Sequence, residues 1–410
     1  MNTRQPVSLG SRRSFLQMSA AASAAMALQV VTEPMLAAAA MGGQREKMAY
    51  RVGGIMINAN ENPLGPCEAA RKAIAEIAAQ GGRYSDWMTD DLLKLFADAE
   101  GLKPDWVRVY PGSSGPLHLS VLSYASPAKS YVTADPGYEA GMRAAKFAGA
   151  RIVKVPLTKT HGHDVKAMVA AAPDAGFFYV CTPNNPTGTL TPHEDVEWLV
   201  ANKPKGSIVM VDEAYIHFSG APSALDLVKG GHDVIVLRTF SKIYGMAGIR
   251  CGMAIGRPEL LEPLGDRSGW SAMPITAVAA AIASLKDAQV VGERKQVNTL
   301  VRQQTFDWLK QQGYSFVPSE ANHFMVDAKR PAKEVIEAMS ARNVFIGRVF
   351  PAWPTHVRIT VGTRAEMTEF QTAFQKVMTN ATSAGYTPAR KLRMRSEDGQ
   401  MRPMTDGDYS

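Results

Sequence analysis

Alternation of short β-rich runs with helical stretches between residues 105 and 257 is the feature that most constrains the fold. Strands are expected at 107–110, 130–134, 151–155, 177–181, 207–212, 234–238 and 251–256. Helices are expected between them at 140–148, 164–172 and 192–202. Such alternation is typical of a mainly parallel sheet with helices on both faces. The sequence therefore predicts an α/β domain built on a seven-stranded sheet.

A second, smaller α/β domain is expected after this one. A helical region at 275–312 is followed by expected strands at 315–317, 323–326 and 357–361 and expected helices at 331–342 and 365–378. From about 382 the composition turns to Gly, Ser, Asp, Arg and Met without periodicity, which predicts a disordered tail. We divide the chain into 1–40, an N-terminal arm with the first helices at 41–104, a large domain at 105–290, a small domain at 291–381 and the tail at 382–410.

The first forty residues resemble a twin-arginine export signal. Residues 11–16 read Ser-Arg-Arg-Ser-Phe-Leu, a weakly apolar run covers 18–31, and four alanines at 37–40 offer a cleavage site. An ordinary amphipathic helix is the alternative. No membrane anchor is expected, because the apolar run is short and polar residues interrupt it. The pattern predicts passage through the twin-arginine translocase and a periplasmic or other extracytoplasmic location.

Composition argues against several partners. The formal net charge of +7 over 410 residues is only mildly basic and indicates no nucleic-acid partner. The three cysteines have no paired spacing, so we expect neither a disulfide framework nor a metal site.

Lys242 is the first candidate catalytic residue. It follows the expected strand 234–238 in the segment 239–252, Thr-Phe-Ser-Lys-Ile-Tyr-Gly-Met-Ala-Gly-Ile-Arg-Cys-Gly. A lysine at a strand end projects into a site, where desolvation and nearby cations lower its pKa and make its amine nucleophilic. Arg250, eight residues on, has a planar fork that suits a phosphate. The glycines around them permit close approach of the backbone.

This segment and four others resemble fold-type I pyridoxal-phosphate (PLP) aminotransferases, and most closely the histidinol-phosphate aminotransferase group. The others are Asn-Glu-Asn-Pro-Leu-Gly at 60–65, Arg-Tyr-Ser-Asp at 83–86, Thr-Pro-Asn-Asn-Pro-Thr-Gly at 182–188 and Asp-Glu-Ala-Tyr at 212–215. Ser85 stands where the family motif has proline. Each motif alone is weak, but all five occur in the family order. The resemblance implies transfer of an amino group from an amino acid or related amine to a 2-oxo acid.

The resemblance assigns residues to the cofactor ring. Lys242 would carry PLP covalently, and Asp212 would pair with the protonated pyridine nitrogen, because a buried carboxylate is costly without a cation. A cap of the following helix is the alternative for Asp212. Tyr215 and Asn185 would donate hydrogen bonds to the ring hydroxyl oxygen, unless Asn185 only forms an Asn-Pro turn. Tyr138 would cover the ring, or be a core tyrosine.

The phosphate of the cofactor is expected in the segment 112–116, Gly-Ser-Ser-Gly-Pro. Its small residues lead into a helix whose N-terminus attracts an anion, with Ser113 and Ser114 as ligands. Ser241 and Arg250 would complete this site. Tyr84 resembles a tyrosine that reaches the phosphate from the neighbouring subunit, so the resemblance implies a homodimer.

Arginines supply the expected substrate site. On the expected strand 357–361 the apolar residues alternate with Arg358, so this arginine faces the other side. It resembles the family arginine that binds the anionic group of the substrate, which is a phosphate or a carboxylate in different members. Arg348 would assist, or form a surface salt bridge, and we assign Asn60 to the same site. As a hypothesis, three bulky residues line the pocket and favour a large or aromatic substrate: Trp87, Met88 and Trp353.

Two alternatives remain open for the function. Another PLP reaction, catalysed by a decarboxylase or lyase acting on an amino acid, depends on which bond lies perpendicular to the ring, and the sequence cannot show that. A non-catalytic protein that binds PLP or an amine is the alternative from another class. The presence of Lys242, Asp212 and Arg250 argues against it.

Overall fold

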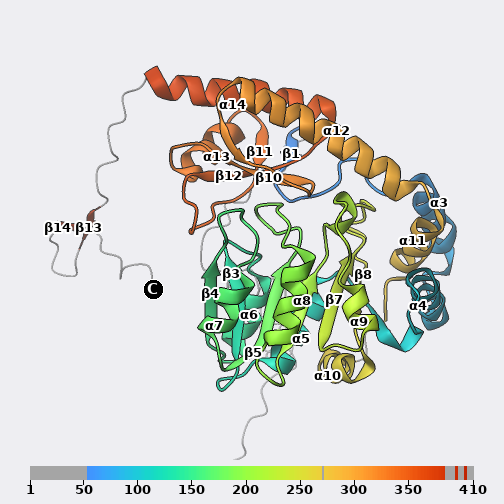
Figure 1. Ribbon diagram of the computed structural model, residues 1–410. Helices are drawn as coiled ribbons and strands as arrows, with labels where there is room; N and C mark the ends of the chain where they lie inside the picture. Colours follow the sequence, from blue (N-terminus) through green and yellow to red (C-terminus); the bar gives the residue numbers. More distant parts are fainter. Residues whose placement is uncertain (1–52, 270–271, 384–392, 396–400, 404–410) are drawn as a thin grey trace, which may run out of the picture. The chain divides into compact units, whose positions relative to one another are not determined.

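A seven-stranded sheet forms the centre of the computed structural model, which describes residues 53–269, 272–383, 393–395 and 401–403 (Figure 1). Its strands, in spatial order, are β2 (Val107–Tyr110), β8 (Gly252–Ile255), β7 (Val234–Thr239), β6 (Ile208–Asp212), β5 (Ala175–Cys181), β3 (Ser130–Asp135) and β4 (Ile152–Pro156). All are parallel except β8, which is antiparallel to both neighbours. The mainly parallel α/β architecture expected from the sequence is confirmed.

Burial explains why these strands are continuous apolar runs. Every residue of β5, β6 and β7 is buried, because helices cover both faces of a parallel sheet. The helices of this part of the chain are α3 (Glu68–Ile77), α4 (Asp86–Glu100), α5 (Ser114–Tyr124), α6 (Ala140–Phe147), α7 (Val165–Ala171), α8 (His193–Asn202), α9 (Leu225–Lys229), α10 (Pro258–Ser268) and α11 (Ile275–Lys286). Short 3₁₀ turns are η1 (Ala78–Gln80), η2 (Pro104–Trp106) and η3 (Ile216–Phe218).

The small domain has its own apolar core and two small sheets. Strands β9 (Ser315–Val317), β10 (His323–Asp327) and β12 (His356–Thr360) form an antiparallel sheet in the order β12-β10-β9. Strands β1 (Ile55–Ile57) and β11 (Val344–Ile346) pair in parallel. Helices α13 (Ala332–Ser340) and α14 (Arg364–Ser383) pack on these sheets.

The described part of the segment 41–104, which we expected to hold an N-terminal arm and the first helices, contributes to both cores. Its strand β1 pairs with β11 of the small domain. Its helices α3 and α4 pack against α11 and bury apolar side chains, such as Leu92 and Phe96, in the core of the large domain. The polypeptide therefore enters the small domain before it builds the large one.

The expected helical region at 275–312 is two helices. Helix α11 and helix α12 (Val290–Gln311) meet at an angle of 83°. Helix α12 joins the two cores, since Val290 packs in the large domain and Phe306 and Leu309 pack in the small one (Figure 1). Among the described residues no single helix is long and apolar enough to cross a membrane, and only the bent pair α11 and α12 meets that test together.

Within 382–410, the segment that we expected to be a disordered tail, the structure describes residues 382–383, 393–395 and 401–403. Helix α14 continues to Ser383, and β13 (Arg393–Arg395) pairs antiparallel with β14 (Met401–Pro403). Main-chain hydrogen bonds between two short strands need no apolar periodicity, so this pairing left no pattern in the composition. The predicted export signal lies outside the described residues.

Candidate active site

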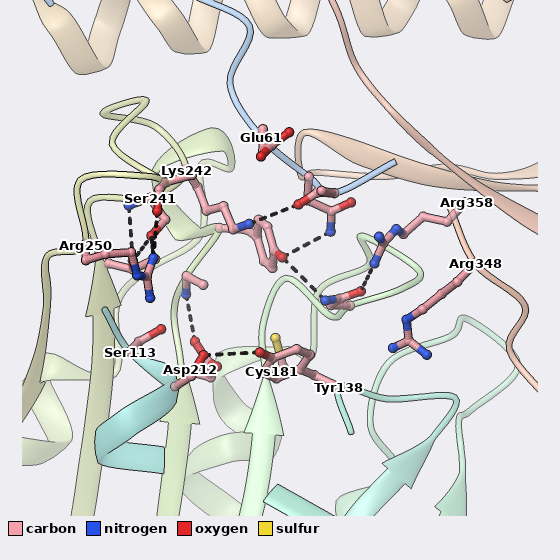
Figure 2. Close-up of a pocket in the computed structure, with 18 residues that line it drawn as sticks. Glu61, Ser113, Tyr138, Cys181, Asp212, Ser241, Lys242, Arg250, Arg348 and Arg358 are labelled. Atoms are coloured by element: carbon pink, nitrogen blue, oxygen red, sulfur yellow. Dashed lines mark hydrogen bonds between the residues drawn. The ribbon is translucent and has the colours of Figure 1, made fainter. Parts of the chain in front are cut away.

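A cavity of about 280 Å³ opens at the carboxyl ends of the central strands, where parallel sheets place their sites. The residues that the sequence assigned to catalysis, to the cofactor and to the anionic group of the substrate line it, except Tyr84. These are Asn60, Ser113, Ser114, Tyr138, Asn185, Asp212, Tyr215, Ser241, Lys242, Arg250, Arg348 and Arg358. Figure 2 shows Lys242 between two groups of side chains, with Ser241 and Arg250 on one side and Arg348 and Arg358 on the other. Tyr84 lies outside the cavity, before α4, and is 77% exposed.

Asp212 is a buried carboxylate at the end of β6. Its Oδ2 accepts a hydrogen bond from the Tyr179 hydroxyl at 2.7 Å, and its Oδ1 accepts one from the Ala214 N–H at 3.1 Å. Burial raises the pKa of Asp212 to about 6, although both hydrogen bonds act in the opposite direction. Among the described residues no lysine or arginine forms an ion pair with it. A cationic group brought to this carboxylate would therefore relieve an unfavourable charge.

Tyr179 positions Asp212, and its hydroxyl can be removed without a change of shape. Tyr179→Phe is expected to raise the dissociation constant of the cofactor, and to lower kcat, by about tenfold each, because hydrogen bonds to charged groups contribute about 1.5–3 kcal/mol. The KM of the amine should change little, since Tyr179 does not line the cavity. Spectroscopic titration and steady-state kinetics measure these quantities. Tyr131→Phe is the matched control, since Tyr131 is equally buried and does not bond to Asp212. Equal effects of the two variants would contradict this role.

Lys242 projects into the cavity three residues after β7. Its Nζ donates to the Ala59 carbonyl at 3.4 Å and lies 5.6 Å from the centre of the Tyr215 ring. Burial, and then the charge of Arg358, lower the pKa of Lys242 to about 8. Its amine is therefore neutral in a larger fraction of molecules at pH 7 than that of an ordinary lysine. A neutral amine is the form that attacks a carbonyl.

This lowered pKa predicts how the rate of cofactor capture depends on pH. The rate at which cofactor-free protein reacts with PLP should rise with pH as Lys242 loses its proton, and level off above a pH of about 8. An ordinary lysine would give a rate that rises to a pH of about 10.4. Stopped-flow absorbance measures this rate. A steady rise through pH 10 would show that Lys242 is not perturbed.

Tyr215 is held by two amides beside Lys242. Its Oη accepts hydrogen bonds from Asn60 Nδ2 at 3.1 Å and Asn185 Nδ2 at 3.5 Å. Because both neighbours donate to this oxygen, its own proton is available to an acceptor in the cavity. Burial raises the pKa of Tyr215, which keeps the hydroxyl protonated at neutral pH.

Backbone and side-chain donors form an anion cradle at the start of α5. Gly112 has a φ of 87°, and a Cβ there would overlap the guanidinium of Arg250. Arg250 donates from Nη1 to the Ser241 Oγ at 3.3 Å. Ser113 directly precedes α5 and Ser114 begins it, and the N-terminal N–H groups of this helix attract an anion. The Ser114 Oγ also lies 3.2 Å from the Tyr138 Oη, and Tyr138 lines the cavity while it also packs against the core of the large domain.

Arg358 and Arg348 reach the cavity from the small domain. Arg358, on β12, donates from Nη1 to Asn185 Oδ1 at 2.8 Å and from Nη2 to the Asn58 carbonyl at 2.6 Å. Burial lowers its pKa to about 10, which still leaves it cationic at neutral pH. Arg348 pairs instead with Glu139, with its Nη1 2.7 Å from Glu139 Oε2. Arg348 therefore lines the cavity and also forms a partly exposed salt bridge, and its part in substrate binding stays a prediction.

The cavity fits PLP. A phosphate matches the cradle of Ser113, Ser241 and Arg250, a protonated ring nitrogen matches buried Asp212, and an aldehyde matches the amine of Lys242. Residues 53–374 match the family model "Aminotransferase class I and II". The chain belongs to the class I and II aminotransferases.

Relatives of this aminotransferase share most of its length. It is 34% identical over 331 residues to the histidinol-phosphate aminotransferase of Moorella thermoacetica, covering 79% of this chain and 85% of that one. It is 35% identical over 328 residues to the aromatic amino acid aminotransferase of Rhodococcus jostii, covering 78% and 88%. The structure of histidinol-phosphate aminotransferase from Sinorhizobium meliloti in complex with PLP matches with a TM-score of 0.71 at 27% identity, covering 79% and 90%. The fold-type I architecture and PLP as cofactor are confirmed.

Several expectations about the cavity differ from the structure. Trp87, Met88 and Trp353 do not line it. Trp87 is 60% exposed, and Met88 lies on the opposite, buried face of α4, because neighbouring helical residues point in different directions. Trp353 packs beside Phe350 and His356. Their assignment to the cavity of this chain was wrong.

Some residues that contact the predicted site residues were not themselves predicted from the sequence. Tyr179, Cys181 and Glu61 adjoin Asp212 or Lys242, and Glu139 holds Arg348. Cys181 could be recognised only from the pairing of β5 with β6, which places it opposite Asp212.

One group of possible metal ligands among the described residues lies away from the cavity. It consists of His193, Glu197 and Asp226 on α8 and α9 and shares no residue with the cavity lining.

Proposed function

We propose that this aminotransferase acts on α-amino acids, and that Arg358 binds their carboxylate. The free donors of Arg358 carry the proposal. A guanidinium has five N–H groups, and Nη1 and Nη2 each use one on Asn185 and Asn58. One N–H on each Nη remains, and two such donors suit the two oxygens of a carboxylate.

The residues around a substrate held this way have complementary tasks. Bound PLP supplies an electron sink for the bond that breaks at the α-carbon. The Lys242 Nζ lies 5.6 Å from the centre of the Tyr215 ring, and its weakly basic amine can take a proton from the α-carbon and would return it to the carbon of the cofactor that carried the aldehyde. Asp212 keeps a positive charge on the ring nitrogen. Asn185 links Arg358 to Tyr215, so the carboxylate and the cofactor are oriented by one network.

We also propose a homodimer in which Tyr84 reaches the phosphate of the neighbouring subunit. In this chain Tyr84 and Trp87 are both strongly exposed at the start of α4, although they are large apolar side chains. Large exposed aromatic residues are enriched where proteins associate. Sedimentation of wild type and of Tyr84→Ala, together with cofactor affinity, tests this assignment.

Export by the twin-arginine route is proposed from the sequence pattern alone. A protein that binds its cofactor in the cytoplasm needs a route for folded cargo, and the paired arginines Arg12 and Arg13 match that route. Cell fractionation of wild type and of an Arg12→Lys, Arg13→Lys double variant tests it. Wild-type protein found only uncleaved in the cytosol would contradict export.

The proposed reaction is tested with a half-reaction screen. Purified holoprotein is mixed with single amines, and the visible absorbance of the lysine-bound cofactor is followed. Carboxylate-bearing amino acids should convert the cofactor to its amine form, and a 2-oxo acid should restore it. Amines without a carboxylate should react poorly. Carbon dioxide release without conversion of the cofactor would instead indicate a decarboxylase.

A further inference from the structure

Arg348 and Arg358, the two arginines that reach the cavity from the small domain, have different hydrogen-bond and ion-pair partners. Arg358 hydrogen-bonds to neutral groups, an amide oxygen and a carbonyl. Arg348 is paired with the carboxylate of Glu139 at 2.7 Å. Among the described residues, no carboxylate forms an ion pair with Arg358, whereas the charge of Arg348, which also lines the cavity, is paired.

Contacts with Gly347 and Phe350 hold the two arginines near one another. Gly347 leaves no room for a side chain against Arg358, and its N–H bonds to the Arg358 carbonyl at 2.8 Å. The two guanidinium carbons lie 4.4 Å and 5.6 Å from the centre of the Phe350 ring, for Arg348 and Arg358 respectively. An anion large enough to span them would meet both.

Glu139 comes from the other domain. It precedes α6 and does not itself line the cavity, but its carboxylate is paired with Arg348, which does. Arg143, one turn further along α6, is exposed and does not line the cavity. Glu139 thus adds a negative charge where a second anionic oxygen of a substrate would bind Arg348.

Substrate anions differ in the charge that they need compensated. A carboxylate carries one negative charge and is satisfied by one guanidinium. A phosphate monoester carries about −1.5 to −2 at pH 7. A phosphate monoester bound at Arg348 would lie beside the negative charge of Glu139. Repulsion between like charges of this kind is a common source of specificity.

We propose that Glu139 is a specificity-determining residue, which neutralises Arg348 and makes the site select amines with a carboxylate over amines with a phosphate monoester. The inference rests on the proposed function, which places the substrate's anionic group at Arg358. The Arg348–Glu139 pair is itself partly exposed, with side chains 44% and 38% accessible, so its strength is small. Discrimination comes from the charge of Glu139, which stays beside the anion even if the pair opens.

A matched pair of amines tests the proposal with holoprotein. L-Histidine and L-histidinol phosphate share the imidazole side chain and the amino group, and differ in the anionic group. Glu139→Gln is expected to raise the ratio of kcat/KM for L-histidinol phosphate to that for L-histidine by about tenfold or more, equivalent to about 1.4 kcal/mol. Arg348→Met in the Glu139→Gln background should remove this gain.

Glu334→Gln is the matched control, because Glu334 forms a comparable exposed pair with Arg330 at 3.2 Å outside the cavity. It should leave the ratio unchanged. A second readout needs no turnover. Binding of acetate and of methyl phosphate is followed by the absorbance of the lysine-bound cofactor, and only methyl phosphate should bind about tenfold more tightly to Glu139→Gln.

The outcomes separate the two proposals. A wild type that converts amino acids, but whose preference and methyl phosphate affinity are unchanged by Glu139→Gln, overturns the role of Glu139 and leaves the proposed function standing. A wild type that converts no carboxylate-bearing amine, and does not bind acetate, overturns the proposed function and the inference together.

Discussion

Replacing Lys242 with alanine is expected to lower kcat/KM of the first half-reaction by at least about 10⁴-fold. A positioned general acid–base group alone contributes about 10²- to 10⁴-fold, and Lys242 would also supply the covalent attachment of the cofactor. The variant should still fold, because truncating Lys242 removes an amine whose burial is unfavourable and leaves the apolar core intact. Single-turnover absorbance with an amino acid measures the loss.

Lys333→Ala is the control for this variant. Lys333 is an exposed lysine on α13, paired with Glu337 at 3.8 Å and outside the cavity. It should react at the wild-type rate. A Lys242→Ala variant that retained activity within tenfold of wild type would show that another group performs the proton transfer.

Asp212→Asn is expected to lower kcat by about 200- to 5,000-fold. The change is nearly isosteric and keeps an acceptor for a hydrogen bond, but it removes the charge that holds the ring nitrogen protonated. Breaking a buried charge pair costs about 3–5 kcal/mol, which corresponds to this range. Affinity for PLP should fall in the same variant, whereas the affinity for acetate at Arg358 should change little.

Thermal unfolding of the cofactor-free protein distinguishes this effect from misfolding. Burial raises the pKa of Asp212, so at neutral pH its charge opposes folding. Asp212→Asn should therefore be no less stable than wild type at pH 7 without PLP. Asp233→Asn, which removes a carboxylate paired with Lys203 and Arg257 at the start of β7, is the control for activity. Equal activity losses in the two variants would contradict the role of Asp212.

Local patterns predicted most of the large domain. Its strands are uninterrupted apolar runs, since both faces are covered, and such runs stand out between helical stretches. The pair β1 and β11 was missed because each strand has three residues and its partner is distant in the chain. The break between α11 and α12 was missed because both flanking segments have a helical pattern.

The sequence predicted those site residues that are polar and stand next to an apolar strand. Lys242, Asp212 and Arg250 are polar residues that directly follow or end apolar runs, and that contrast is visible in the sequence. Tyr179 lies inside such a run and reads as a core residue, and its bond to Asp212 exists only because β5 and β6 pair in register. Glu139 reads as an ordinary acidic residue at a helix start, and only the fold brings Arg348 to it.

Covalent attachment of PLP to Lys242 can be tested by trapping the cofactor on the protein. Holoprotein is treated with sodium borohydride, which makes the bond between the cofactor and its lysine permanent, and is then digested and analysed by mass spectrometry. One modified residue, Lys242, is expected, and the Lys242→Ala variant should carry no modification. Modification of a different lysine, or none in a protein that has bound PLP, would contradict it.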